Sequence, residues 1–142
     1  MKLVRHVLDS KGSNVISVSP TESVLGAIKL MAEKGIGALV VMQGTKLAGV
    51  VTERDYARKV ILKDKSSHNT PISDIMTTDV FTARLDDTVE HCMNIMTDQR
   101  IRHLPVVDAG KVVGMISIGD LVKAVIADQQ EAIQHLEQYI TG

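Results

Sequence analysis

The sequence predicts a mixed α/β fold in which one β-α-β-β-α unit is used twice with pseudo-twofold symmetry. Residues 15–61 align without a gap to residues 80–126. Both stretches close with a glycine, an apolar run, a hydroxyl and an aspartate, first in "GVVTERD" and again 65 residues later in "GMISIGD". A repeat of this length indicates one supersecondary unit per copy. Because one such unit alone would leave a face of its sheet exposed, we expect the two units to cover each other.

The first repeat predicts a strand, a helix, two strands and a second helix. The short apolar stretch Val15–Val18 predicts the first strand. Thr21 is expected to cap the following helix, which ends at a left-handed Gly35. Two apolar strands are expected at 38–42 and 47–51, on either side of the turn "QGTK". A second helix is expected to start near Thr52.

The second repeat predicts the same order of elements, namely strand Val80–Ala83, a helix from Asp86 or Asp87 to Gln99, strands His103–Val107 and Lys111–Ile116, and a helix from Ser117. The chain is therefore divided into an N-terminal segment, a first repeat, a polar linker, a second repeat and a C-terminal helical extension, at 1–13, 14–62, 63–75, 76–127 and 128–142. The last helix is expected to continue through the extension. Its apolar side chains could form a stripe against the body or a partner: Val125, Ile126, Ile133, Leu136 and Ile140.

The composition argues against several functional classes. Sixteen basic and seventeen acidic residues give a net charge of −1, which offers no general attraction to nucleic acid or to an anionic membrane. No apolar run reaches transmembrane length, and the N-terminus lacks the apolar stretch of a secretory signal, so we expect a soluble cytoplasmic protein. Adjacent His91 and Cys92 lack the spacing of a metal chelate, and no nucleophile can be matched with a base. No catalytic and no metal residues are therefore assigned.

The two glycine-to-aspartate endings hold the candidate binding residues. A hydroxyl where a strand meets a helix lies beside unpaired N–H groups, which suits a phosphate oxygen. An aspartate three residues later can accept hydrogen bonds from two ribose hydroxyls. Thr52 with Asp55, and Ser117 with Asp120, fit these two roles. The same residues also form capping boxes that satisfy helix N-terminal donors, and taken alone they favour capping. Close approach of a neighbour or ligand is allowed by a glycine in each preceding strand, Gly49 and Gly114.

The paired β-α-β-β-α units, the segment "IRHLPVVDAGKVVGMIS" and the two endings closely resemble a tandem pair of cystathionine β-synthase (CBS) domains over about residues 14–126. The resemblance implies a stand-alone, non-enzymatic module for signal transduction, which forms homodimers and regulates a protein that the sequence does not identify. It also implies two clefts for an adenosyl ligand, namely AMP, ADP, ATP, NAD or S-adenosylmethionine, and so favours ligand binding over capping alone. Two alternatives stay open: a structural dimerisation module with vestigial clefts, and a small enzyme that acts on a nucleotide.

Carried over by position, the resemblance implies that each cleft draws residues from both repeats. In the first cleft, three residues of the first repeat face five others: Thr52, Arg54 and Asp55 face Met76, Thr77, Val80, Arg102 and His103. In the second cleft the corresponding sets are Ile116, Ser117 and Asp120, facing Asn14, Ile16, Gly37 and Ala38. The apolar members would flank adenine. Arg54 and Arg102 are the expected phosphate partners of the first cleft. Because Gly119 stands where the first repeat has Arg54, the second cleft is expected to lack positive charge and to bind weakly or to take a less charged ligand.

Overall fold

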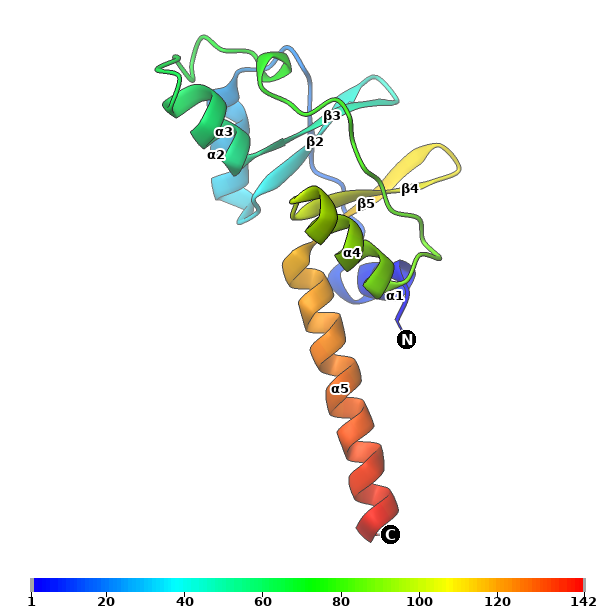
Figure 1. The fold of residues 1–142 in the computed structure, drawn as a ribbon. Helices are drawn as coiled ribbons and strands as arrows, with labels where there is room; N and C mark the ends of the chain where they lie inside the picture. The colour runs from blue at the N-terminus through cyan, green and yellow to red at the C-terminus, as the bar shows by residue number, and fades with distance from the viewer. Residues whose placement is uncertain (1, 142) are drawn as a thin grey trace. The chain divides into compact units, whose positions relative to one another are not determined.

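The structure, a computed structural model, describes residues 2–141, and the chain forms two compact units (Figure 1). The first-repeat unit spans Val15–Val80. The second-repeat unit combines the N-terminal residues up to Asn14 with the chain from Phe81 onward. Each unit has its own hydrophobic core, so each is described by itself.

The first-repeat unit is a three-stranded sheet with helices packed on it. Strand β1 pairs in parallel with β2, and β2 pairs antiparallel with β3. The first four residues of β2 are all buried, which explains why this strand is an unbroken apolar run rather than an alternating one. The elements are β1 (Ser17–Val18), α2 (Val24–Lys34), β2 (Ala38–Gln43), β3 (Lys46–Thr52), α3 (Glu53–Tyr56), a π-helical turn (Ala57–Ile61) and a 3-10 turn (Ile72–Asp74).

The second-repeat unit is a two-stranded antiparallel sheet surrounded by three helices. Its elements are α1 (Val4–Lys11), α4 (Val89–Gln99), β4 (His103–Asp108), β5 (Lys111–Ser117) and α5 (Ile118–Thr141). The two antiparallel hairpins share an irregularity at equivalent places, since the register shifts after Val41 in one and after Val106 in the other. This common irregularity and the shared helix-strand-strand-helix order, preceded by β1 in the first repeat and by a single bridge at Ala83 in the second, confirm the predicted internal repeat and fold class. The long α5 also confirms that the last helix continues through the C-terminal extension.

Each unit includes a segment that precedes the other repeat in the chain. Helix α1 comes before the first repeat yet packs in the second-repeat unit, where backbone N–H groups of Val4 and Arg5 donate to carbonyls at 87 and 85 over 2.9 Å. Conversely, the residues just before the aligned stretch 80–126 join the first-repeat unit, because Thr77 exchanges hydrogen bonds of 2.9 and 3.0 Å with Val50 of β3. The compact units and the sequence repeats thus divide the chain differently, and the domain boundaries given above stay a prediction.

Two predicted helix starts are wrong, and the reason is the same in both. The cap of α2 is Ser23 rather than Thr21, and its hydroxyl accepts a 3.1 Å bond from the N–H of Gly26. The cap of α4 is Thr88, not Asp86 or Asp87, since the Thr88 hydroxyl accepts a 3.0 Å bond from the N–H of His91. In both helices the cap is the hydroxyl residue directly before the first buried valine, the position from which a short side chain reaches the N3 amide.

The predicted strand Val80–Ala83 is also wrong. Within the described residues, this stretch makes only one bridge, in which Ala83 exchanges hydrogen bonds of 2.8 and 2.9 Å with the backbone on either side of Val106. The matching strand of the first repeat is itself reduced to Ser17–Val18. Gly35, by contrast, ends α2 in the left-handed conformation with φ of 65°, as predicted.

Candidate functional site

The first candidate site begins where β3 ends and α3 starts. The N–H of Thr52 donates to Oδ2 of Asp55 over 3.0 Å, and the N–H of Asp55 donates back to the Thr52 hydroxyl over 3.1 Å. The hydroxyl in turn donates to the same carboxylate oxygen over 3.0 Å. These reciprocal bonds form a capping box, so the local chemistry expected from the spacing is present. Both side chains are half-buried, which holds the carboxylate in one orientation.

A lysine that the sequence analysis did not single out completes this arrangement. The Nζ atom of Lys59 lies 3.1 Å from Oδ1 of Asp55 and donates a 2.8 Å bond to the carbonyl of Ile75. Lys59 is four residues after Asp55, a spacing that places two helical side chains on one face. This spacing was visible in the sequence and could have identified the pair. Arg54, the expected phosphate partner, occupies the first turn between the two capping residues and is half-buried.

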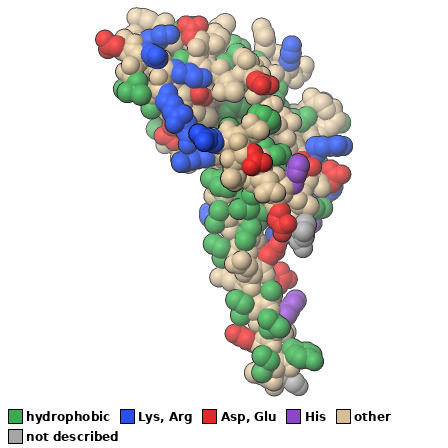
Figure 2. Space-filling view, viewed as in Figure 1, with side chains coloured by type: hydrophobic (Ala, Val, Ile, Leu, Met, Phe, Trp, Pro, Cys, Tyr) green, Lys and Arg blue, Asp and Glu red, His purple; other side chains and the backbone are tan. Residues whose placement is uncertain are grey.

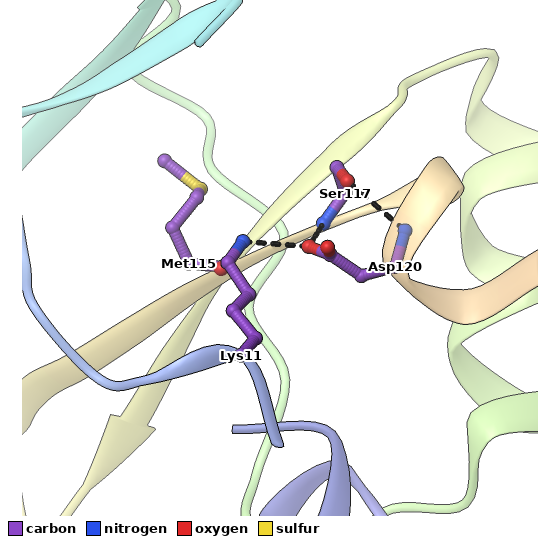
Figure 3. Close-up of polar contacts among 4 residues, drawn as sticks. All are labelled: Lys11, Met115, Ser117 and Asp120. Carbon is purple, nitrogen blue, oxygen red and sulfur yellow. Dashed lines mark hydrogen bonds and ion pairs between the residues drawn. The ribbon is translucent and has the colours of Figure 1, made fainter. Parts of the chain in front are cut away.

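The second candidate site repeats the capping box where β5 meets α5. The N–H of Ser117 donates to Oδ2 of Asp120 over 2.8 Å, and the N–H of Asp120 donates to the Ser117 hydroxyl over 3.2 Å. Here too a lysine reaches the carboxylate, but it comes from helix α1 (Figure 3). The ammonium of Lys11 lies 2.6 Å from Oδ2 of Asp120 and 2.6 Å from the carbonyl oxygen of Met115.

The contact with Lys11 sets the charge of the second site. Burial raises the pKa of Asp120, but the hydrogen bonds from Lys11 and Ser117 and the charge of Lys11 outweigh burial, so the net pKa lies below its usual value. Asp120 is therefore an ionised carboxylate at neutral pH. The expectation that this site lacks positive charge is wrong. The signal was absent from local spacing because Lys11 and Asp120 are 109 residues apart.

Each site also has a glycine in the preceding strand at which the chain is approached closely. A Cβ atom at Gly49 would lie 2.6 Å from the carbonyl oxygen of Thr77 and 3.1 Å from Sδ of Met76. A Cβ atom at Gly114 would lie 2.7 Å from a methyl carbon of Leu8. Neighbours in the same unit thus disfavour a side chain at both glycines, most strongly at Gly49 where the neighbour is main chain, and this accounts for the glycines without a ligand.

The remaining predicted site residues fall in both units. The first-repeat unit contains Ile16, Gly37, Ala38, Met76, Thr77 and Val80, together with Thr52, Arg54 and Asp55. The second-repeat unit contains Asn14, Arg102, His103 and Ile116, together with Ser117 and Asp120. Within the units, Ala38 pairs with Thr52 in one sheet and His103 pairs with Ser117 in the other. The carbonyls of Gly37 and Arg102 accept bonds of 3.1 and 2.9 Å from the first amides of α3 and α5. The facing of residues across the two repeats stays a prediction.

Within residues 2–141, no three His, Cys, Asp or Glu side chains are grouped as a metal ion would require. None of the helices described is both long enough and apolar enough to cross a membrane. Burial of Cys92, assisted by the charge of Asp87, raises the pKa of its thiol to about 11, so this side chain is a neutral core group.

Comparisons with known proteins are in line with the repeat. The family model of the CBS domain matches residues 4–62 and 72–127. The chain is 39% identical over 148 residues to the mitochondrial CBS domain-containing protein CBSX3 of Arabidopsis thaliana, covering 98% of this chain and 72% of that protein. It is also 51% identical to a solved structure from Burkholderia ambifaria MC40-6, described as a signal-transduction protein with CBS domains. That match has a TM-score of 0.87 and covers 90% of this chain and 96% of the other.

A third similar structure contains ligands. It is the CBS domain pair of protein MJ0100, solved in complex with 5′-methylthioadenosine and S-adenosyl-L-methionine. The present chain is 28% identical to it with a TM-score of 0.80, and the match covers 90% of this chain and 98% of that one. The predicted cytoplasmic location of the present chain stays a prediction.

Proposed function

The chain belongs to the CBS-domain family, and from this membership we infer that it is a regulatory module rather than an enzyme, with an adenine nucleotide as its ligand. The candidates AMP, ADP, ATP and NAD share an adenosine whose ribose offers two adjacent hydroxyls. A fixed carboxylate is the group that accepts hydrogen bonds from such a pair. The relative solved with two adenosyl compounds supports this ligand class. In the proposal, the ribose hydroxyls bind at Asp55 and at Asp120.

The observation that carries the proposal is the duplicated half-buried carboxylate at a strand-to-helix junction. At both junctions the capping box fixes the carboxylate, and a lysine balances its charge. A carboxylate has about four lone-pair sites, so one that caps a helix and binds an ammonium keeps capacity for a ribose hydroxyl. The neighbouring N–H groups of the helix start and the lysine ammonium then favour phosphate oxygens.

The two sites are expected to differ in the number of phosphates they favour. Arg54 lies in the first turn of the first site, whereas Gly119 holds the equivalent position of the second. Lys11 supplies the second site with one positive charge that the sequence did not predict. We therefore expect both sites to accept a phosphate, with the first site binding ATP more tightly than the second. A nucleotide-dependent change in the module would then be read by a partner protein, with the module itself acting as a homodimer.

Substitution by asparagine tests the role of the aspartates without removing the helix caps. The caps Thr52 and Ser117 are left in place, and an asparagine at position 55 or 120 keeps a side-chain oxygen that can accept the bond from the cap amide, so Asp55→Asn and Asp120→Asn should retain the fold. Both variants lose the charge and one acceptor oxygen, so we expect each to weaken adenosine, AMP and ATP at its own site. Isothermal titration calorimetry on the two single variants and the double variant should show one site lost in each single variant and both lost in the double variant.

The sugar provides an independent control. A 2′-deoxy nucleotide should bind the unmodified protein as weakly as the ribonucleotide binds the asparagine variants. The deoxy sugar lacks a hydroxyl donor and the variant lacks a carboxylate acceptor, so the same hydrogen bond is lost in both cases. Ligand present at 100 times its dissociation constant would also add about 2.7 kcal/mol to the unfolding free energy. Equal affinity for ribo and deoxy forms would overturn the assigned role of the aspartates. If no adenine nucleotide shifts the melting curve, the structural module with vestigial clefts takes the lead, and release of a new nucleotide product would favour the enzyme.

A further inference from the structure

Helix α5 exposes an apolar stripe that begins at Val122 and becomes more exposed toward its C-terminal end. In Figure 1 the C-terminal half of α5 extends beyond α1 and α4, the helices with which its first turns pack. The exposed fraction rises along the stripe from 41% at Val122 to 54% at Ile133 and 79% at Ile140. Apolar side chains are visible along this segment in Figure 2. A stripe of this kind on an exposed helix marks an interaction surface.

The spacing of the stripe is that of a coiled coil. Successive members alternate between four and three residues apart, which is the 3.5-residue period of a heptad seam. In heptad notation the a positions are Ile126, Ile133 and Ile140, and the d positions are Val122, Gln129 and Leu136. Gln129 is the one polar member among these six positions, and it lowers the stability of the seam.

The flanking residues fit a second copy of the same helix in antiparallel orientation. The antiparallel register that pairs all six seam residues places Lys123 opposite Glu137 of the second copy, and the twofold axis produces this pair twice. On the other flank, Tyr139 of the second copy lies opposite Val125, whose side chain is already partly buried against the core of its own unit. A parallel pair would instead place Val125 against Gln130 and Ala132 against Glu137, and would leave Lys123 without an acidic neighbour on the seam.

The charge of the polar face argues against a membrane as the occupant. Helices that lie on anionic membranes carry Lys and Arg beside the apolar stripe. From residue 122 to residue 140, this helix has one lysine, Lys123, and three acidic residues, Asp128, Glu131 and Glu137. The stripe thus has complementary charge for its own copy and an unfavourable charge for a lipid surface.

We propose that residues 122–140 of α5 bind the same segment of a second copy as an antiparallel coiled coil. This inference is independent of the proposed nucleotide function. It is tested first by the mass of the full chain in solution at micromolar concentration, measured by light scattering. Ile133→Glu should halve the mass of the assembly, whereas Gln134→Glu, which adds the same charge on the neighbouring polar face, should leave it unchanged. A monomeric unmodified chain, or an assembly that both variants leave intact, would overturn the proposal.

Charge reversal then tests the orientation without removing an apolar residue. Lys123→Glu and Glu137→Lys should each raise the dissociation constant of the assembly by about tenfold, because both symmetric pairs become repulsive. The double variant restores opposite charges and should restore the affinity. If the single reversals have no effect, or if the double variant adds their losses, the antiparallel pairing is wrong.

Disulfide trapping gives a second readout of orientation. In the antiparallel register Ala132 lies opposite Ala132 of the second copy, whereas Leu136 lies opposite Ile126 of that copy. Ala132→Cys should therefore form a covalent dimer under mild oxidation, and Leu136→Cys should not. The unmodified chain is the control, since its Cys92 is buried. Trapping at position 136 and not at 132 would show a parallel pair and overturn the proposal.

Discussion

Adding one methyl group at Gly49 should destabilise the protein far more than adding it at Gly114. At Gly49 the new Cβ would lie 2.6 Å from the main-chain oxygen of Thr77, so this oxygen must retreat by roughly 0.8 Å to reach an ordinary 3.4 Å contact. The main chain at Thr77 is held by two hydrogen bonds to Val50 and cannot move alone. At Gly114 the obstacle is the tip of the Leu8 side chain, 2.7 Å away, which can turn aside.

The expected magnitudes follow from these obstacles. Overpacking costs about 1–3 kcal/mol, and the loss of glycine flexibility in the unfolded chain offsets about 0.4–1 kcal/mol of this cost. We therefore expect Gly49→Ala to lower the free energy of unfolding by about 2 kcal/mol and Gly114→Ala by less than about 1 kcal/mol. For a chain of 142 residues, 1 kcal/mol corresponds to about 3 °C in melting temperature.

Urea unfolding followed by circular dichroism, together with thermal melts, measures both variants. Leu8→Ala provides the matched control, since it removes the obstacle at Gly114 and leaves Gly49 as it was. Gly114→Ala should therefore cost nothing further in the Leu8→Ala background. Because Met76 and Thr77 are candidate ligand residues, Gly49→Ala should also weaken nucleotide binding. An equal or larger loss of stability for Gly114→Ala would refute the reasoning that backbone obstacles cost more than side-chain obstacles.

Three further predictions concern the charged and buried groups. The pKa of Asp120 is lower in the folded protein than in the unfolded one, so the stability that Asp120 contributes is complete above the unfolded pKa and is lost as the pH falls through the folded pKa. Lys11→Met should therefore make the free energy of unfolding less dependent on pH in acid, which urea titrations between pH 6 and 3 would measure. An unchanged pH dependence would show that the ion pair does not stabilise the fold. Cys92, with its pKa raised to about 11 and no exposed surface, should react with a disulfide reagent only after denaturation, and rapid reaction of the native protein would contradict its burial. Leu39→Ala, at a fully buried position, should cost about 2–5 kcal/mol, whereas Leu62→Ala, 76% exposed, should cost under about 0.5 kcal/mol, and similar losses would place Leu39 outside the core.

The sequence predicted those elements whose signal is local and strong. The hairpin strands came from apolar runs around turn residues, and the end of α2 came from Gly35, because burial and left-handed backbone leave a direct mark on residue choice. Helix starts were less accurate, since several hydroxyl and acidic residues precede each helix and any of them can cap. No strand forms at Val80–Ala83, because this stretch pairs with β4 at Ala83 alone, through one bridge to Val106.

The candidate site divides in the same way. Thr52 and Asp55, or Ser117 and Asp120, are three residues apart, so a sequence pattern can identify each capping box. Lys59 was within reach of the same reasoning, because it is one helical turn from Asp55. Lys11 was not, because its contact with the second box depends on the packing of α1 on β5. Tertiary packing of a distant segment leaves no periodic signal in the sequence.

The two lysines show how the repeats keep the same charge with different residues. At the 65-residue offset, the counterpart of Lys59 is Ala124, whereas Lys11 lies before the stretch that aligns between the repeats. Each site therefore uses a lysine with no counterpart at the other, yet an ammonium lies within 3.1 Å of Asp55 and within 2.6 Å of Asp120. In both cases the same ammonium also binds a main-chain carbonyl, of Ile75 or Met115. The two lysines come from non-equivalent positions, so what the two sites share is the need of the carboxylate for a nearby cation. A half-buried carboxylate fixed by a helix cap is costly unless a cation is close, and each unit supplies that cation from whichever segment packs beside the junction.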